Sequence, residues 1–355
     1  MNKFITGTMA AAIALGGSFA ADHADAATRE LRFAEYGPNA GARSIGVKWL
    51  DEELRKRSDG ELGLDIIWGG ALVGASGAAK AISDGVADMG SITATYAPGE
   101  LVTYEAVDTL VFPDEYVGVM AAYDLMTTHP AALKEADDFN IRYFGNYTTG
   151  PTQLLTRDKP VSSIDDLQGM TIRAVGVMVP ALEASGAATV AVPQPKTYEA
   201  LSNGSVDGTA TYYYVVNGYK QYEVADYMTE LNMGQITGFG IVMNKQTFES
   251  LSPEHQDMMT ELGRDFTVKM AEIMSTLRVK TKAQLVEGID GHSIEIVEPD
   301  DGMRATLIQA AEKDAQNWLA KAENKGLDGE EIFAAYRDLV ESYQAGVDAD
   351  GYPWE

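Results

Sequence analysis

The chain contains no cysteine among its 355 residues. This absence excludes disulfide bridges, thiol catalysis and metal sites built from cysteine ligands. Histidine is also scarce, and the four present (His23, His129, His255 and His292) include no pair at metal-binding spacing. The sequence contains no P-loop, no G-x-S-x-G elbow and no G-x-G-x-x-G run after a strand. We therefore expect a protein that is not an enzyme and that uses neither a metal nor a cofactor.

Positive charge is the second shortage. The chain has 27 lysines and arginines against 53 acidic residues, which gives a formal net charge of −26. A field of that sign repels nucleic acid and anionic membrane surfaces, so neither is an expected partner. An anionic ligand would also be repelled at long range. Any anion site in this chain therefore needs a local, permanently charged donor.

Long hydrophobic runs are absent, and the most apolar segment lies at the N-terminus. Lys3 precedes a run of small apolar residues from Met9 to Ala21, and the sequence Ala24-Asp25-Ala26 follows it. This run is too short to cross a bilayer, and it ends in an A-x-A cleavage site. We predict a signal peptide over residues 1–26, cleaved near Ala26. Cleavage after Ala20 and an uncleaved anchor are the alternatives.

The remaining sequence alternates between strand-like and helix-like segments. Leu31 to Glu35 is an apolar strand that ends in the turn Tyr36-Gly37-Pro38-Asn39. Val47, Leu50 and Leu54 then fall on one face of an amphipathic helix. Repetition of this alternation predicts βαβ units and a largely parallel, doubly wound sheet.

A second alternating block and a long helix follow. The expected strands of this block are Thr152–Thr156, Met170–Arg173, Thr189–Val192, Asp207–Thr211, Tyr227–Met233 and Gly238–Asn244. Ser252 and Pro253 provide an N-cap and a first-turn proline for a helix that extends to about Glu287. We predict an α/β fold of two lobes with a ligand cleft between them and this helix bridging both. Residues 27–150 with about 239–280 would form lobe I, and 151–238 with about 281–355 lobe II.

One arginine stands out in this pattern. Arg173 ends the apolar strand in the sequence DDLQGMTIRAVG. A guanidinium is planar, keeps its proton and can donate two parallel hydrogen bonds to a carboxylate. The residues alone leave two interpretations open, because Arg173 could bind an anionic ligand or form a structural salt bridge.

Four segments together resemble the solute-binding proteins of TRAP transporters (the DctP family), which are tripartite ATP-independent periplasmic systems. These segments are SSIDDLQGMTIRAVG, ASGAATVAVPQPKTYEALSNGSVDGT, VADYMTE and MNKQTFESLSPEHQDMM, with looser agreement at LRFAEYGP, AISDGVADMG and LVFPDEY. The resemblance implies a periplasmic protein with a type II-like binding fold that captures a small organic acid. It also implies docking on the membrane permease subunits of the transporter. In this family the position of Arg173 binds the ligand carboxylate.

Two positions depart from the common family pattern. Gln153 stands where many members have a second arginine, and Thr211 stands where an asparagine is common. We therefore expect Arg173 to be the only strong cation in the site and the ligand to be a monocarboxylate. An aromatic acid is the first candidate, because three tyrosines follow Thr211. A zwitterionic osmolyte such as ectoine, held by cation–π contacts, and a C4-dicarboxylate are the alternatives.

The other candidate ligand-binding residues are aromatic or hydroxylated. Of the tyrosines at 212–214, we expect Tyr212 or Tyr214 at the site, since neighbours on a strand face opposite ways. The remaining candidates lie at strand ends or near lobe crossings, where a packing or hinge role is equally open: Tyr36, Thr95, Tyr96, Tyr147 and Phe239.

Overall fold

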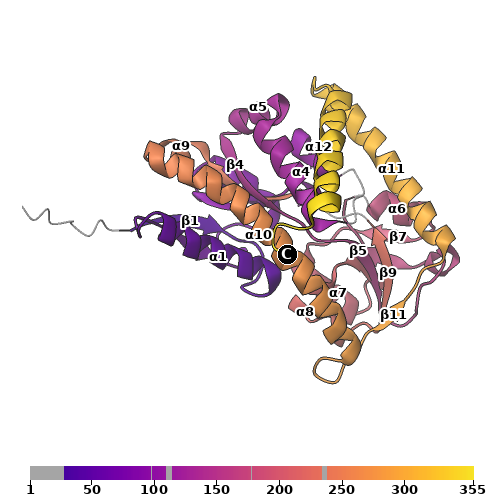
Figure 1. The fold of residues 1–355 in the computed structure, drawn as a ribbon. Helices are drawn as coiled ribbons and strands as arrows, with labels where there is room; N and C mark the ends of the chain where they lie inside the picture. The colour runs from indigo at the N-terminus through magenta and orange to yellow at the C-terminus, as the bar shows by residue number, and fades with distance from the viewer. Residues whose placement is uncertain (1–27, 97, 109–113, 177, 234–237) are drawn as a thin grey trace, which may run out of the picture.

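Two separate β-sheets, each flanked by helices, build the two lobes of the protein (Figure 1). The computed structural model describes residues 28–96, 98–108, 114–176, 178–233 and 238–355, with side chains at all of these except 95, 311, 312 and 314. The expected signal peptide lies outside the described residues. Of the helices in the described part, none combines the length and the apolar character needed to cross a membrane. The predicted two-lobed α/β fold is confirmed.

The first sheet has five strands in the order β2-β1-β3-β10-β4. Their bounds are β1 Arg29–Ala34, β2 Leu62–Ile67, β3 Met89–Thr93, β4 Ile141–Tyr147 and β10 Phe239–Asn244. Strand β1 runs parallel to β2 and β3, whereas β10 is antiparallel to both β3 and β4. The carboxyl ends of β1 and β3 therefore meet at the same edge of the sheet.

The second sheet has six strands in the order β11-β9-β5-β8-β6-β7. Their bounds are β5 Thr152–Thr156, β6 Thr171–Arg173, β7 Ala188–Val190, β8 Gly208–Thr211, β9 Tyr227–Met233 and β11 Glu295–Val297. Strand β5 is antiparallel to β8 and β9, and the other pairs are parallel.

The expectation of a largely parallel sheet is therefore only partly right. Strands β4 and β5 are consecutive in the chain but lie in different sheets, and so do β9 and β10. Two neighbouring strands run parallel when a connecting helix carries the chain back to the end of the sheet at which the first strand began. A chain that crosses directly into the other sheet has no such connection. The two strands that receive a crossing, β5 and β10, are the antiparallel ones.

Twelve α-helices in the described part pack around the sheets. Their bounds are α1 Gly41–Arg57, α2 Ala78–Ser83, α3 Val102–Glu105, α4 Glu115–Thr128, α5 Pro130–Asp138, α6 Met178–Ala184, α7 Thr197–Ser202, α8 Tyr213–Gly218, α9 Lys245–Glu249, α10 Pro253–Glu287, α11 Asp301–Asn324 and α12 Gly329–Asp350.

Helix α10 bridges the two lobes, as predicted. The Ser252 hydroxyl accepts the backbone N–H of His255 at 3.1 Å, which caps the helix, and Pro253 occupies its first turn. In its first half, Phe266 packs into the core of the first lobe. Near its end, Leu285 packs into the core of the second lobe. Figure 1 shows α10 as the long orange helix that runs obliquely past both sheets.

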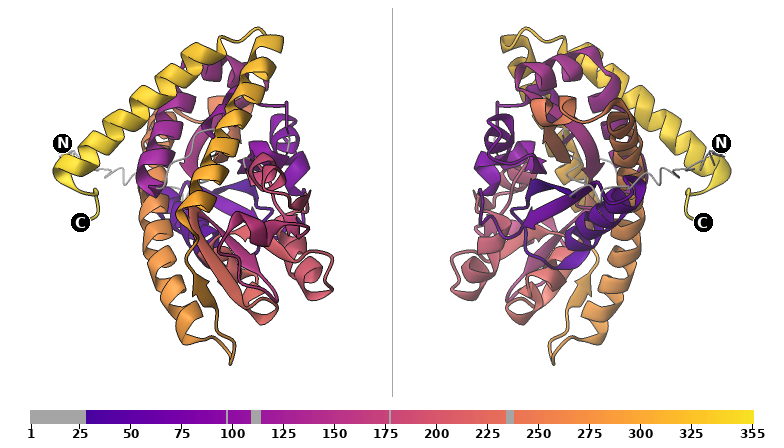
Figure 2. Two further views of the ribbon diagram at one scale, coloured as in Figure 1. Left: turned by 90° about the vertical axis from the view of Figure 1, so that its right-hand side faces the viewer. Right: turned by 90° about the vertical axis from the view of Figure 1, so that its left-hand side faces the viewer.

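Helix α11 also connects the lobes. Its first half buries Met303 and Leu307 in the second lobe, whereas the Trp318 indole N–H donates to the Val102 carbonyl of α3 at 2.8 Å. Helix α12 packs on α4 of the first lobe, and Figure 2 shows α11 and α12 meeting at a turn and then diverging. The sequence-based division instead groups residues 281–355 with lobe II. The lobe boundaries stay a prediction, and the contacts of Trp318 and α12 with the first lobe have to be considered when they are drawn.

Candidate functional site

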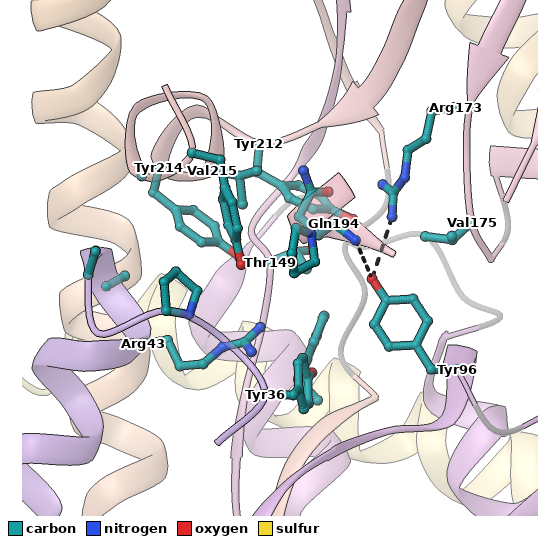
Figure 3. A pocket seen from close by; sticks show the side chains of 18 residues that line it. Tyr36, Arg43, Tyr96, Thr149, Arg173, Val175, Gln194, Tyr212, Tyr214 and Val215 are labelled. Carbon is teal, nitrogen blue, oxygen red and sulfur yellow. Dashed lines mark hydrogen bonds between the residues drawn. The ribbon is translucent and has the colours of Figure 1, made fainter. Parts of the chain in front are cut away.

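A pocket lies where strand ends of the two sheets face each other (Figure 3). The first lobe contributes the turn after β1, the 3-10 turn after β3 and the first residue of β10. The second lobe contributes the end of β6 and the turn that links β8 to α8. Aromatic and polar side chains line the pocket together, as is usual for small-molecule sites. Its location at the carboxyl ends of strands agrees with the general rule for α/β folds.

Arg173 lines this pocket at the end of β6. The loop before β6 is fixed by a capping box, in which the Asp166 carboxylate accepts the backbone N–H groups of Ser162 and Ser163. These hydrogen bonds hold the pKa of Asp166 below its usual value. Gly169, with a φ of 74°, then turns the chain into the strand. The capping box and the glycine turn thus fix the position of the loop that leads into β6, whose end lies at the pocket.

Within the described part of the chain, the guanidinium of Arg173 is bound only by neutral groups. It donates to the carbonyl oxygens of Val192 at 2.9 Å and Ala210 at 3.4 Å, and to the Tyr96 hydroxyl at 3.5 Å. The residue is only 1% exposed, and no carboxylate within the described ranges pairs with it. Burial of an ionised group costs several kcal/mol unless an opposite charge compensates it. The pocket therefore contains a cation that is available to bind an anionic ligand.

Tyr212 and Tyr214 form one wall of the pocket. Their rings stack at 6.0 Å with an interplanar angle of 13°. The expected strand ends at Thr211, so Tyr212 is the N-cap of α8 and Tyr214 lies in its first turn. Tyr213 faces away, and its hydroxyl donates to the Glu230 carboxylate. The alternation assumed for a strand singled out Tyr212 or Tyr214, and both line the pocket, but a helix start places them there.

The opposite wall comes from the first lobe. Tyr36 lies in the turn after β1, Tyr96 in the 3-10 turn after β3, and Phe239 at the start of β10, and all three line the pocket. The Tyr36 and Tyr96 rings meet edge to face at 6.2 Å. Tyr147 stacks on Phe239 at 5.4 Å and is not part of the lining.

Gln153 and Thr211, like Tyr147, lie outside the lining, and the side chain of Thr95 is not described. Gln153 is fully buried, donates to the Asn232 side-chain oxygen at 2.8 Å and accepts the Asn232 backbone N–H at 3.1 Å. Thr211 donates to the Gln221 side-chain oxygen at 3.3 Å. Both therefore serve to pack the second lobe around β5 and β8.

The pocket contains a second arginine that was not predicted from the sequence. Arg43, in the first turn of α1, lines the pocket and pairs with Glu35 at 2.9 Å. Arg173 is therefore not the only cation of the site, contrary to the expectation. A signal was present, because a cation in the first turn of a helix is unfavourable next to the positive end of the helix dipole. No acidic residue occupies that turn.

Burial controls the protonation of the pocket walls. It raises the pKa of Tyr212 to about 12, although the Arg173 charge opposes the shift. Burial likewise raises the pKa of Tyr214 and of Tyr219, which also lines the pocket, against the opposing charge of Arg43. These hydroxyls are therefore neutral hydrogen-bond donors at neutral pH. Among the described residues, no group of three or more acidic or histidine side chains could hold a metal ion.

A family model agrees with this architecture. The model of bacterial extracellular solute-binding proteins, family 7 (DctP), matches residues 33–322. A curated solute-binding protein of Sulfitobacter sp. (strain NAS-14.1) is 28% identical over 228 residues. That alignment covers 62% of this chain and 67% of the relative.

Two solved structures share both the fold and part of the sequence. A TRAP periplasmic solute-binding protein from Bordetella bronchiseptica, with bound (R)- and (S)-mandelate, is 27% identical with a TM-score of 0.77. The match covers 89% of this chain and 99% of that one. A marine metagenome TRAP solute-binding protein specific for aromatic acids, in complex with 3-hydroxybenzoate, is 25% identical with a TM-score of 0.78. That match also covers 89% and 99% of the two chains.

Proposed function

The chain belongs to the bacterial extracellular solute-binding proteins of family 7, the periplasmic binding components of TRAP transporters, and from this premise we propose that its pocket captures an aromatic monocarboxylate. The observation that carries the proposal is the Arg173 guanidinium, buried at 1% exposure and without a carboxylate partner among the described residues. A ligand carboxylate would supply the missing charge through paired hydrogen bonds. The loaded protein would then deliver the acid to the membrane permease subunits.

The aromatic walls favour a flat ligand. Tyr212 and Tyr214 stack on one side of the pocket, and Tyr36 and Phe239 line the other. A benzene ring between them would gain stacking and edge contacts that an aliphatic chain does not. The mandelate and 3-hydroxybenzoate complexes of the two similar proteins support the same class of ligand.

The two alternative ligands have weaker support. A C4-dicarboxylate needs a second available cation, but the charge of Arg43 is already compensated by Glu35 at 2.9 Å. A zwitterion such as ectoine needs an acceptor for its cation. The aromatic faces could serve as one, but Glu35, the acid beside the pocket, is engaged by Arg43 and has a fully buried side chain.

A ligand screen tests the proposal. Thermal unfolding of the purified protein would be followed with benzoate, 3-hydroxybenzoate and mandelate, and with cyclohexanecarboxylate, succinate and ectoine as competing classes. A ligand present at about 1,000 times its Kd stabilises the folded state by roughly 4 kcal/mol. We expect the aromatic acids to raise Tm most, with cyclohexanecarboxylate well below benzoate. A larger shift with succinate or ectoine would refute the proposed ligand class.

A further inference from the structure

A buried charge pair forms one side of the pocket. The Glu35 carboxylate accepts the backbone N–H of Gly37 at 2.6 Å, the Ser91 hydroxyl, and the Arg43 guanidinium at 2.9 Å. The Glu35 side chain is fully buried, whereas that of Arg43 is 17% exposed. The acid is thus held from three sides, and the arginine is the partner that faces the pocket.

The Arg43 guanidinium uses only part of its hydrogen-bonding capacity. One of its nitrogens, Nη1, donates to Glu35, and no other described group accepts from it. Its central carbon lies over the rings of Tyr36 at 4.6 Å, Phe239 at 5.2 Å and Tyr147 at 5.3 Å. These rings hold the cation in place without accepting its N–H groups in the guanidinium plane. Donors of Arg43 therefore remain available at the pocket.

A second observation points to a missing polar group at the same place. The Tyr36 hydroxyl is buried next to the Tyr147 hydroxyl, and within the described part of the chain neither makes a hydrogen bond of normal geometry. A buried hydroxyl without a good partner destabilises the protein until a ligand supplies one. Tyr36 and Arg43 both line the pocket. Figure 3 shows them on the side away from Arg173, whose guanidinium enters from the other lobe.

We propose that Arg43, Glu35 and Tyr36 form a second subsite that binds a neutral oxygen on the ligand, such as a ring hydroxyl, and disfavours a second carboxylate. This inference rests on the proposed function and specifies the aromatic acid as a hydroxylated one. Arg43 donates to the ligand oxygen, while the Tyr36 hydroxyl can accept or donate. Glu35 makes the subsite neutral overall. A second carboxylate would therefore add an uncompensated charge in a desolvated place.

Titration calorimetry with benzoate, 3-hydroxybenzoate, 4-hydroxybenzoate, isophthalate and terephthalate tests the subsite. In the unmodified protein, we expect at least one hydroxybenzoate to bind about tenfold more tightly than benzoate, and the diacids to bind more weakly. One hydrogen bond from a charged donor is typically worth at least that factor. The double variant Glu35→Gln with Arg43→Met removes both charges together, so neither remains buried alone. It should lose the hydroxyl preference, so that the hydroxybenzoates bind to this variant no more tightly than benzoate does.

Glu35→Gln alone changes the charge and keeps the shape. The Arg43 charge then becomes available, so isophthalate or terephthalate should gain about tenfold or more relative to benzoate. Arg142→Met is the matched control, because this guanidinium also lies on a ring, 4.0 Å from Phe248, but outside the pocket. It should leave every ligand ratio unchanged.

A glycine substitution reaches the same pair without altering a charged residue. A β-carbon at Gly37 would lie 2.8 Å from Arg43 Nη1 and 2.9 Å from Glu35 Oε1, so Gly37→Ala displaces the pair. It should reduce the hydroxyl preference, whereas Gly74→Ala, which meets no atom within 4 Å, should not. Benzoate binding with an unchanged hydroxyl preference in the double variant and in Gly37→Ala overturns the subsite alone. If the unmodified protein binds none of the aromatic acids, the proposed function fails as well.

Discussion

Replacement of Arg173 by methionine separates a ligand-binding arginine from a structural one. The guanidinium is only 1% exposed, and its described partners are two carbonyl oxygens and a hydroxyl at 2.9, 3.4 and 3.5 Å. A structural arginine would be paired with a buried carboxylate, and loss of that pair would leave an acid uncompensated. Methionine keeps an unbranched apolar side chain and removes the charge.

The structure sets the expected magnitudes. A carboxylate on Arg173 would receive two charge-assisted hydrogen bonds, each worth about 1.5–3 kcal/mol, so Kd should rise by roughly 10²–10⁴-fold. In the ligand-free protein, the lost bond to the Val192 carbonyl costs about 1–3 kcal/mol. Removal of an uncompensated buried charge offsets this cost, and Tm should stay nearly constant. Loss of one partner of a buried ion pair would instead cost about 3–5 kcal/mol.

Calorimetry with benzoate and melting of the ligand-free protein measure the two quantities separately. Arg304→Met provides the control, because Arg304 also binds only backbone carbonyls in the described structure, those of Leu231 and Glu230, each at 3.0 Å. Arg304 lies outside the pocket. The control should leave Kd unchanged. An Arg173→Met variant with unchanged Kd, or one whose ligand-free Tm falls by many degrees, would refute the reasoning.

Two further predictions concern stability. Burial raises the pKa of Glu135 to about 7, although the backbone N–H of Thr103 donates to its carboxylate and opposes the shift. The protonated form therefore stabilises the folded state, and this stabilisation is lost as pH rises from about 4.5 to about 7. Glu135→Gln should flatten this fall in Tm, and identical pH profiles would contradict the assignment. A β-carbon at Gly263 of α10 would lie 2.0 Å from the Phe144 carbonyl oxygen, so Gly263→Ala should lower Tm by several degrees. Gly346→Ala, in the exposed part of α12 with no atom within 4 Å, should raise Tm slightly, and equal effects of the two alanines would count against the close packing.

The sequence predicted best the features that depend on local chemistry. Ser252 and Pro253 start α10 as expected, because an N-cap hydroxyl and a first-turn proline act within one turn of helix. Strand β5 has the expected bounds, Thr152–Thr156, since an apolar run bounded by turn residues identifies a buried strand. Arg173 was found at the pocket because it ends a strand, and strand ends line the cleft of such folds.

The features that the sequence did not predict depend on distant contacts. The side-chain amide of Gln153 donates a hydrogen bond to Asn232, which is 79 residues away in the chain. The direction in which the Gln153 side chain points could therefore not be derived from the sequence of its own strand. The antiparallel direction of β10 depends on a crossing between lobes, which no local pattern specifies. Arg43 becomes a pocket residue only because the turn at Gly37 leaves room for its pair with Glu35.

The pair between Glu35 and Arg43 changes how the charge of the pocket should be counted. From one expected arginine, the sequence predicted one ligand carboxylate. Two arginines line the pocket, but Glu35 compensates Arg43 at 2.9 Å, while no described carboxylate pairs with Arg173. One uncompensated cation in a chain with a net charge of −26 favours a singly charged anion, since a second negative charge would have no partner in a desolvated pocket. On the proposed function, the number of carboxylates on the ligand therefore depends on a buried acid beside the pocket and not on the number of arginines that line it.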